Sequence, residues 1–374
     1  MRPIKLVDLR DQYLQIKPEV DKAIQNVLLG TDFIQGEEVK KFERALSENM
    51  DGAHVVSCGN GTDALQIAMM ALGFKPGDEV IVPVFTYVAT AEVIALLNLV
   101  PVFADVHADS FNLDASGLEK LITKKTVAIV PVHLFGQCAD MAPLLDFAAR
   151  HKLYVIEDAA QALGASYEFP NGKRAKSGTM GAINTTSFFP TKNLGAFGDG
   201  GAILTKNEEL AERSRMMANH GQKKKYYHEI VGVNSRLDTL QAAILNVKLP
   251  RLKTYEEKRR QVADFYDSRL KDVRFIRTPA RMSYSTHVFH QYTVIAEGID
   301  RDALKLFLQE RGVPTNVFYP LPLHLQQAYR KDAFGKGSFP VAEKLSTSVL
   351  SLPIHTEMDE EQLSYICDCI RNFK

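Results

Sequence analysis

The chain has 374 residues with 45% hydrophobic content and no low-complexity tract, which excludes a disordered chain and allows two domains with a sizeable core. Lys plus Arg and Asp plus Glu balance at 45 each, so no overall field favours nucleic acid or an anionic membrane. We therefore expect small molecules as partners, with no nucleic acid and no membrane.

Targeting signals and metal motifs are not evident. No N-terminal apolar segment has signal-peptide form, and apolar runs such as residues 89–100 are too short and too interrupted to span a bilayer. A cytoplasmic protein is expected. The cysteines fit neither a disulfide framework nor zinc-ligand spacing, so we expect reduced packing residues and no metal site at Cys58, Cys138, Cys367 and Cys369.

The first fifty residues predict a helical arm. Apolar residues recur at helical spacing in residues 21–29 and 37–50, with Gly30 and Gly36 between them. From His54 onward, short β-branched runs alternate with amphipathic stretches, which is typical of βα units around a mostly parallel sheet. The expected strands are residues 54–58, 79–83, 102–106, 127–132 and 154–157, and the expected helices are residues 62–72, 86–97, 116–121 and 141–150.

The pattern changes in the last third of the chain. Residues 183–189 and 201–205 predict a strand pair, and beyond Leu249 a helix, a strand and a helix are expected at residues 255–270, 291–295 and 301–311. We therefore expect an α/β fold with a large domain over residues 1–249, including the N-terminal arm, and a smaller α+β domain over residues 250–374.

A lysine follows an apolar strand in the segment Ser-Phe-Phe-Pro-Thr-Lys-Asn-Leu-Gly, residues 187–195. A lysine held at the mouth of an apolar core loses its proton more readily and becomes a nucleophile toward carbonyls. Lys192 is therefore a Schiff-base candidate. An ordinary surface lysine in a turn is the alternative at this point.

A glycine-rich segment, residues 57–64 (Ser-Cys-Gly-Asn-Gly-Thr-Asp-Ala), joins an expected strand to an expected helix. The free N–H groups of a helix start suit a phosphate. The spacing Gly59-x-Gly61-x-x-Ala64 also matches the dinucleotide fingerprint, so a nicotinamide-dependent oxidoreductase is an alternative. The next strand lacks the terminal acid that would hold a ribose. A glycine-rich turn that binds nothing is the third interpretation.

Two acids, Glu157 and Asp158, end an expected strand at the edge where open α/β sheets bind ligands. Their side chains point to opposite faces, so only one faces a site. A helix cap is the alternative for Asp158. A pyridine cofactor acts as an electron sink when its ring nitrogen stays protonated beside a carboxylate. A phosphate site, Asp158 and Lys192 together predict pyridoxal 5'-phosphate.

Five segments carry a resemblance to a known family: residues 59–65 (Gly-Asn-Gly-Thr-Asp-Ala-Leu), 85–90 (Phe-Thr-Tyr-Val-Ala-Thr), 157–161 (Glu-Asp-Ala-Ala-Gln), 187–192 and 234–238 (Asn-Ser-Arg-Leu-Asp). Together they resemble the DegT/StrS family of fold-type I, pyridoxal-phosphate-dependent sugar aminotransferases. The resemblance extends from about residue 4 to the C-terminus.

The resemblance implies roles for individual residues. Lys192 would form the internal aldimine and move the proton between the substrate Cα and the cofactor, and Asp158 would pair with the ring nitrogen. Further contacts to the cofactor are implied for Tyr87 over the ring, for Gln161 at the phenolic oxygen, and for Gly61, Thr62 and Ser187 at the phosphate.

The family supplies one phosphate ligand from the neighbouring subunit, which corresponds to Asn234 and implies a homodimer with shared active sites. Arg236 would meet the donor carboxylate or an acidic sugar, with an ion pair to Asp238 as the alternative.

In the small domain, Tyr319 and His324 match the family's substrate segment, whereas Phe318 stands where many members have histidine. His133, near a strand end, is interpreted as a core histidine.

The implied activity is transfer of the amino group of L-glutamate, through pyridoxamine phosphate, to a keto-sugar nucleotide. Similarity over residues 58–64, 136–140 and 231–245 is greatest to members acting at C3, such as the UDP-2-acetamido-3-oxo-glucuronate aminotransferases, so we expect a UDP- or dTDP-linked 3-keto sugar. Amination at C4 of a 4-keto-6-deoxy sugar nucleotide is the alternative. Lys192 argues against the family's sugar 3-dehydratases, which carry histidine there. A non-catalytic sensor would be expected to lack Lys192 or Asp158.

Overall fold

The computed structural model describes residues 2–330 and 334–373. A seven-stranded sheet in the order β1-β9-β8-β5-β4-β2-β3 organises the larger part of the chain. Neighbouring strands from β8 to β3 are parallel, and β9 runs antiparallel to both β1 and β8. The predicted α/β class with a mostly parallel sheet is therefore confirmed. The strands are β1 (His54–Cys58), β2 (Glu79–Pro83), β3 (Val100–Ala104), β4 (Thr126–Ile129), β5 (Tyr154–Asp158), β8 (Ile183–Ser187) and β9 (Gly201–Thr205).

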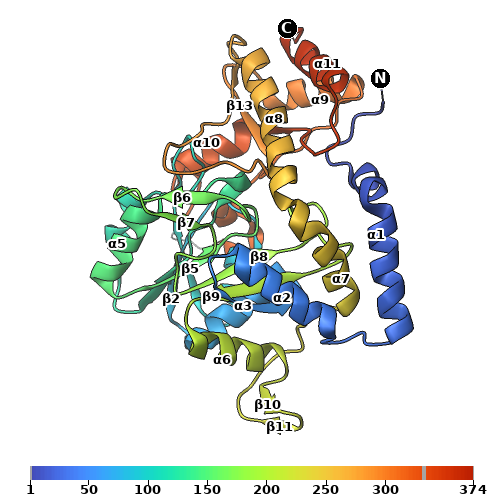
Figure 1. Cartoon of the computed structure of the whole chain (residues 1–374). Coiled ribbons are helices and arrows are strands. Elements are labelled where there is room, and N and C mark those ends of the chain that lie inside the picture. The colour runs from blue at the N-terminus through green and yellow to red at the C-terminus, as the bar shows by residue number, and fades with distance from the viewer. Residues whose placement is uncertain (1, 331–333, 374) are drawn as a thin grey trace.

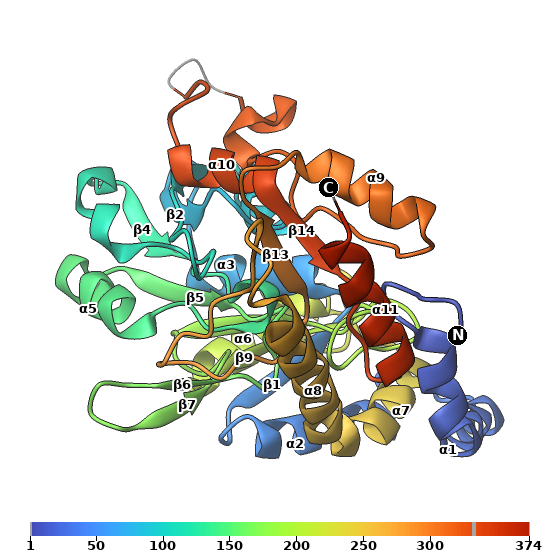
Figure 2. The ribbon, with the colours of Figure 1, turned by 90° about the horizontal axis from the view of Figure 1, so that it is seen from above.

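Helices cover both faces of this sheet (Figures 1 and 2). Alternation along β9 separates the two faces, because Ile203 belongs to one hydrophobic cluster while Ala202 and Leu204 belong to another. The first face carries α3 (Gly61–Leu72), α4 (Ala89–Leu96) and α6 (Glu208–Ala218), and the second carries α2 (Glu37–Asn49) and α7 (Thr239–Lys248). Helix α5 (Met141–His151) packs on β4 and β5, and α1 (Leu9–Gly30) packs along α7.

A second core lies around a three-stranded sheet in the order β12-β13-β14. Its elements are α8 (Leu252–Leu270), β12 (Ile276–Arg277), β13 (Tyr292–Ala296), α9 (Arg301–Glu310), β14 (Val349–Leu352) and α11 (Glu360–Arg371). Ile4 packs into this second core, whereas Ala342 and Leu345 of α10 (Pro340–Ser348) pack into the first. Chain segments from both predicted domains therefore contribute to both cores, and the boundary near residue 250 stays a prediction.

Two small ribbons were not predicted. Strand β6 (Ser166–Glu168) pairs with β7 (Arg174–Lys176), and β10 (Gln222–Lys224) pairs with β11 (Tyr227–His228). The β10–β11 hairpin projects away from the body of the molecule (Figure 1). Its short, charged strands lack the alternating apolar pattern from which strands are predicted.

Some predicted boundaries were wrong. The helix expected at residues 116–121 consists of two 3-10 turns, Ala115–Gly117 and Glu119–Leu121, because the Asp114 carboxylate accepts from the backbone N–H of Ser116 at 2.9 Å and competes with helix formation. Strand β3 begins two residues before the expected start. Its Pro101 is tolerated because β3 is the edge strand of the sheet.

Candidate active site

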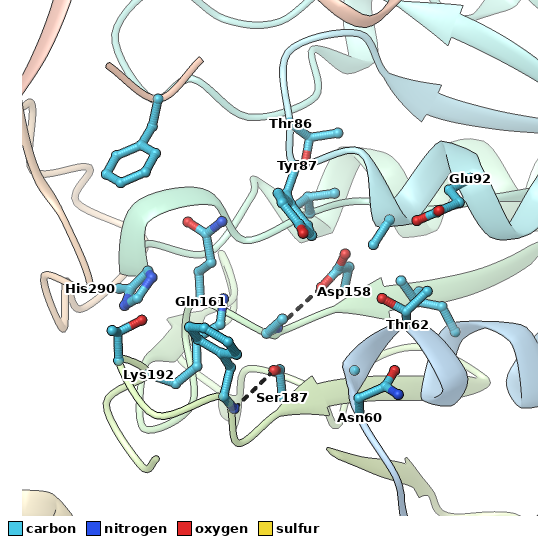
Figure 3. A pocket seen from close by; sticks show the side chains of 18 of the residues that line it. Asn60, Thr62, Thr86, Tyr87, Glu92, Asp158, Gln161, Ser187, Lys192 and His290 are labelled. Carbon is cyan, nitrogen blue, oxygen red and sulfur yellow. Dashed lines mark hydrogen bonds between the residues drawn. The ribbon is translucent and has the colours of Figure 1, made fainter. Parts of the chain in front are cut away.

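One cavity of about 680 Å³ opens at the carboxyl ends of the parallel strands, where α/β sheets bind ligands. It brings together most of the residues predicted for the site, and Figure 3 shows several of them pointing into it. These are Gly61, Thr62, Tyr87, Asp158, Gln161, Ser187, Lys192 and Tyr319. The predicted residues that do not line the cavity are Asn234, Arg236 and His324.

The lysine segment forms a tight turn directly after β8. The backbone N–H of Lys192 donates to the Phe189 carbonyl at 2.8 Å, and that of Ala196 donates to the Phe188 carbonyl at 2.8 Å. Gly195 is required because a Cβ there would lie 2.2 Å from the Pro190 carbonyl oxygen. This turn directs the Lys192 side chain into the cavity rather than to the surface.

Burial changes the chemistry of the Lys192 amine. It lowers the pKa of the ε-ammonium to about 8, and the nearby Asp158 charge opposes that shift. A substantial fraction of the protein molecules therefore carries a neutral Lys192 amine near physiological pH. The neutral amine is the form that attacks a carbonyl. The alternative of an ordinary surface lysine does not agree with this placement.

The start of α3 lies against the end of β8. Asn60 caps the helix, and its Oδ1 accepts from the backbone N–H of Asp63 at 2.8 Å. A Cβ at Gly61 would lie 2.7 Å from the Ser187 Cβ, so only glycine permits this approach. Free helix N–H groups, Thr62 and the Ser187 hydroxyl then surround one end of the cavity, an arrangement that suits a phosphate.

Adjacent acids at the end of β5 face opposite ways, as predicted. Glu157 is fully buried, and its carboxylate accepts from the backbone N–H groups of Gly178 at 2.8 Å and Gly181 at 2.7 Å. His133 Nε2 lies 2.7 Å from the same carboxylate, while His133 Nδ1 accepts from the backbone N–H of Ala139. His133 is thus the core histidine that was predicted, outside the cavity lining.

Asp158 is the acid that faces the cavity (Figure 3). Its Oδ1 accepts from the backbone N–H of Ala160 at 3.1 Å, so it also has the cap-like contact that was the alternative. Its Oδ2 accepts from the hydroxyl of Thr90 at 2.8 Å. Each oxygen accepts one hydrogen bond, so the carboxylate keeps acceptor positions for a donor inside the cavity.

Gln161 connects β5 to the C-terminal part of the chain. Its Oε1 accepts from the backbone N–H of Phe135 at 2.8 Å, and its Nε2 donates to the Tyr319 hydroxyl at 3.1 Å. Burial raises the pKa of the Tyr319 hydroxyl, which therefore stays protonated. Tyr87 is more than half exposed at 56% and lies with its ring centroid 6.3 Å from that of Tyr319.

Asn234 and Arg236 lie on the segment that precedes α7 and do not line the cavity of their own chain. Asn234 is exposed, and the Arg236 guanidinium donates to the Asn219 side-chain carbonyl at 3.3 Å. Within residues 2–330 and 334–373, no ion pair forms between Arg236 and Asp238.

His324 does not line the cavity. It is fully buried, and its Nε2 lies 3.1 Å from the Glu343 carboxylate, with the imidazole packed edge-on against Phe339. The 3-10 turn Leu323–Leu325 directs it into the protein. His324 thus contacts Glu343 and does not line the cavity, and its contact with substrate stays a prediction.

Two residues near the reactive groups were not singled out from the sequence. Thr90 lies within a recognised motif but had no role assigned, and His290 precedes β13. His290 lines the cavity, and burial together with the positive charges of Lys192 and Arg259 lowers the pKa of its imidazole well below the usual range. His290 is therefore neutral. Its position depends on how the second sheet packs against the first, which no local pattern encodes.

The residues present fit a phosphorylated pyridine aldehyde. A glycine-lined cradle at a helix start suits the phosphate, a carboxylate faces the cavity for a ring nitrogen, and a lysine of lowered pKa suits the aldehyde. This site at the end of a mostly parallel sheet defines the class of fold-type I pyridoxal-phosphate enzymes. The chain belongs to the DegT/DnrJ/EryC1/StrS aminotransferase family, whose model matches residues 14–371.

Curated relatives span almost the whole chain. It is 47% identical over 372 residues to the UDP-2-acetamido-2-deoxy-3-oxo-D-glucuronate aminotransferase of Pseudomonas aeruginosa, covering 99% of this chain and 100% of the relative. It is likewise 47% identical over 372 residues to a protein named pleiotropic regulatory protein from Geobacillus stearothermophilus, covering 99% of this chain and 98% of the relative. Similarity at this level therefore extends to proteins named for different activities.

A solved structure agrees with the fold closely. The S. venezuelae protein DesV, in complex with a ketimine intermediate, superposes with a TM-score of 0.94 at 40% identity, covering 99% of this chain and 98% of that one. In the described part of the chain, no helix is long and apolar enough to cross a membrane. The same residues contain no cluster of three or more His, Cys, Asp or Glu placed to hold a metal ion. All four cysteines are buried and free.

Proposed function

We propose that this protein is a pyridoxal-phosphate-dependent aminotransferase that moves the amino group of L-glutamate to a keto-sugar nucleotide, at C3 of a UDP- or dTDP-linked 3-keto sugar. The observation that carries the proposal is the convergence of Lys192, Asp158 and the Gly61 cradle on one cavity in a member of a sugar aminotransferase family. The C3 position rests on the name of the P. aeruginosa relative, which denotes a 3-oxo sugar.

The bound cofactor supplies an electron sink that stabilises negative charge at the carbon losing its proton. The ε-amine of Lys192 would hold the cofactor through its aldehyde and, when free of it, would accept the proton from the amino donor's α-carbon. A pKa of about 8 suits both tasks, because the amine exchanges protons near neutral pH.

The other residues of the cavity are assigned to holding and orienting the cofactor and the sugar. Asp158 would pair with the protonated ring nitrogen, and Gly61, Thr62 and Ser187 would bind the phosphate. Tyr87 would lie over the ring. Gln161 would donate an N–H to the phenolic oxygen of the cofactor. Its side-chain carbonyl accepts from the Phe135 N–H, and this bond fixes the orientation of the amide. Tyr319 reaches the sugar from the C-terminal side.

A homodimer completes the site in this proposal. Asn234 and Arg236 lie outside the cavity of their own chain, on a segment held beside the Gly59 loop by Ser235, whose hydroxyl accepts from the Gly59 N–H at 2.9 Å and donates to Asp63 at 2.6 Å. A second copy would bring Asn234 to the phosphate and Arg236 to an anionic group of the substrate.

A substrate panel tests the proposal. Purified protein loaded with pyridoxal phosphate is given L-glutamate and either 3-keto or 4-keto sugars linked to UDP or dTDP, and the products are identified by mass spectrometry and NMR. Amination of a 3-keto substrate with release of 2-oxoglutarate is the expected result. If only the 4-keto substrates were aminated, the proposed position of amination would be C4 and not C3.

The same assay distinguishes other classes of protein. Lys192→Ala is expected to abolish amination while leaving the protein folded, and turnover by this variant would contradict the mechanism. A sensor would bind cofactor without turnover on any substrate. A nicotinamide-dependent oxidoreductase would reduce the keto sugar when NADH replaces glutamate.

A further inference from the structure

We propose that Thr90 is a positioning residue that holds the Asp158 carboxylate in the orientation needed by the cofactor ring. The inference rests on the proposed function and adds to it a residue with no contact to substrate. The Thr90 hydroxyl donates to Asp158 Oδ2 at 2.8 Å, and neither residue exposes more than 6% of its surface.

The contact joins two elements far apart in sequence. Thr90 lies in the first turn of α4, and Asp158 is the last residue of β5. A threonine hydroxyl in a helix can donate to a backbone carbonyl one turn earlier, which would satisfy the donor locally. Thr90 instead directs its hydroxyl to the carboxylate that faces the cavity. This donor therefore serves the site rather than the helix.

Each oxygen of the Asp158 carboxylate accepts one hydrogen bond. Ala160 N–H occupies a position on Oδ1 and Thr90 occupies a position on Oδ2, so rotation of the carboxylate about its Cβ–Cγ bond is restricted. A hydrogen bond to an ionised group is stronger than a neutral one, and here both partners are buried. The remaining acceptor capacity is thereby aimed into the cavity in one orientation.

Loss of the Thr90 hydroxyl frees this rotation without removing any group that touches the ligand. The proton on the ring nitrogen is then held less firmly, and the electron sink weakens. Turnover is expected to fall while substrate binding is preserved, because contacts with substrate are unchanged.

The experiment compares three variants of the loaded protein. Thr90→Val keeps the shape of the side chain and removes the hydroxyl, and Thr90→Ser restores it. Thr293→Val is the matched control, because Thr293 is equally buried and its hydroxyl lies 2.8 Å from that of Ser351 in the second sheet, away from the cavity. The readouts are the pH titration of the visible absorption, the dissociation constant of pyridoxal phosphate, the unfolding midpoint, and kcat and KM with glutamate.

Thr90→Val is expected to lower kcat about tenfold with KM nearly unchanged, to shift the absorption titration and to weaken cofactor binding, as loss of a charge-assisted hydrogen bond predicts. Thr90→Ser should restore the wild-type titration, and Thr293→Val should change only the unfolding midpoint. An unchanged titration in Thr90→Val, or equal losses in Thr90→Val and Thr293→Val, would overturn the proposal. The titration and the cofactor affinity decide the role of Thr90 even if wild-type protein aminates none of the keto sugars, an outcome that would contradict only the proposed substrate.

Discussion

The Nε2 of Gln161 donates to the hydroxyl of Tyr319 at 3.1 Å, across the cavity from the β5 end to the C-terminal part of the chain. The direction of this bond is fixed, because the Phe135 N–H occupies the carbonyl oxygen of the same amide and leaves only the NH2 group to face Tyr319. The tyrosine oxygen is thus an acceptor from Gln161, and its own hydrogen is free to be donated to a ligand.

This direction predicts the behaviour of Tyr319→Phe. The variant loses a donor to the sugar and leaves one amide N–H of Gln161 without its partner, so KM for the keto-sugar nucleotide should rise roughly three- to tenfold, the usual effect of one neutral hydrogen bond. Steady-state kinetics with the sugar varied at saturating glutamate measure it. Tyr266→Phe is the matched control, because its buried hydroxyl donates to the Pro353 carbonyl in the second core. Equal KM values in wild type and Tyr319→Phe would remove Tyr319 from the substrate site.

The pH dependence of Lys192 follows from its burial. Because burial lowers the pKa of this amine to about 8, the neutral form grows as pH rises through that value. Labelling of the cofactor-free protein by an amine-acylating reagent, followed by peptide mapping, should show a rate at Lys192 that rises with a midpoint near pH 8. The Asp158 charge raises that pKa, so Asp158→Asn should move the midpoint lower. A midpoint near that of a free lysine, about 10.4, would contradict the buried geometry.

The buried Lys248 supports the turn that carries Lys192. Lys248 is 1% exposed, donates through Nζ to the Gly195 carbonyl, and lies over the Phe197 ring at 5.4 Å. Burial, with a smaller contribution from the Arg259 charge, lowers the pKa of Lys248 to about 8. A lysine whose pKa is lowered in the folded state costs stability when charged, and this cost is complete below pH 8 and disappears as pH rises toward 10.5.

Lys248→Met is therefore expected to raise the free energy of unfolding at pH 7 by an amount that shrinks as pH rises above 8, because it removes a buried charge. It should also lower kcat, because the Gly195 carbonyl loses its donor and the turn holding Lys192 loosens. Chemical denaturation at pH 7 and pH 9.5, together with kcat, measures both effects. A variant with unchanged kcat would show that the turn needs no support from α7.

The β1–α3 turn and the lysine turn were predictable from sequence because each is local. Glycines at fixed spacing and a helix cap specify them without knowledge of the rest of the fold, although the strand expected to end at residue 189 ends at Ser187. Positions that depend on packing between distant segments were not predictable. His324 points inward, where its Nε2 lies 3.1 Å from the carboxylate of Glu343 on α10. The 3-10 turn that carries His324 has too few residues to show a periodic pattern in the sequence.

Gly61 tests the phosphate cradle directly. Gly61→Ala would place a Cβ 2.7 Å from the Ser187 Cβ, so the start of α3 must move away from β8. We expect the dissociation constant of pyridoxal phosphate to rise at least about tenfold, since helix N–H groups bind a phosphate only at close range. Gly30→Ala, where a Cβ meets nothing within 4 Å, is the control and should bind as wild type does. Wild-type affinity in Gly61→Ala would place the phosphate elsewhere.

Complementation between subunits tests whether Asn234 acts on the neighbouring site. Lys192→Ala removes the amine from its own cavity, and Asn234→Asp places a carboxylate against the phosphate of the other cavity. Each variant alone should form inactive dimers. After mixing, unfolding and refolding, a hybrid dimer holds both defects in one site and leaves the other site intact.

Random pairing makes half of the dimers hybrids with one intact site each, so the mixture should recover about a quarter of wild-type activity. The proportion of hybrids can be checked with differently tagged chains. Activity that stays at the level of the separate variants, with hybrids present, would show that Asn234 serves the cavity of its own chain. That result is difficult to reconcile with the placement of Asn234 outside that cavity, on an exposed part of the segment before α7.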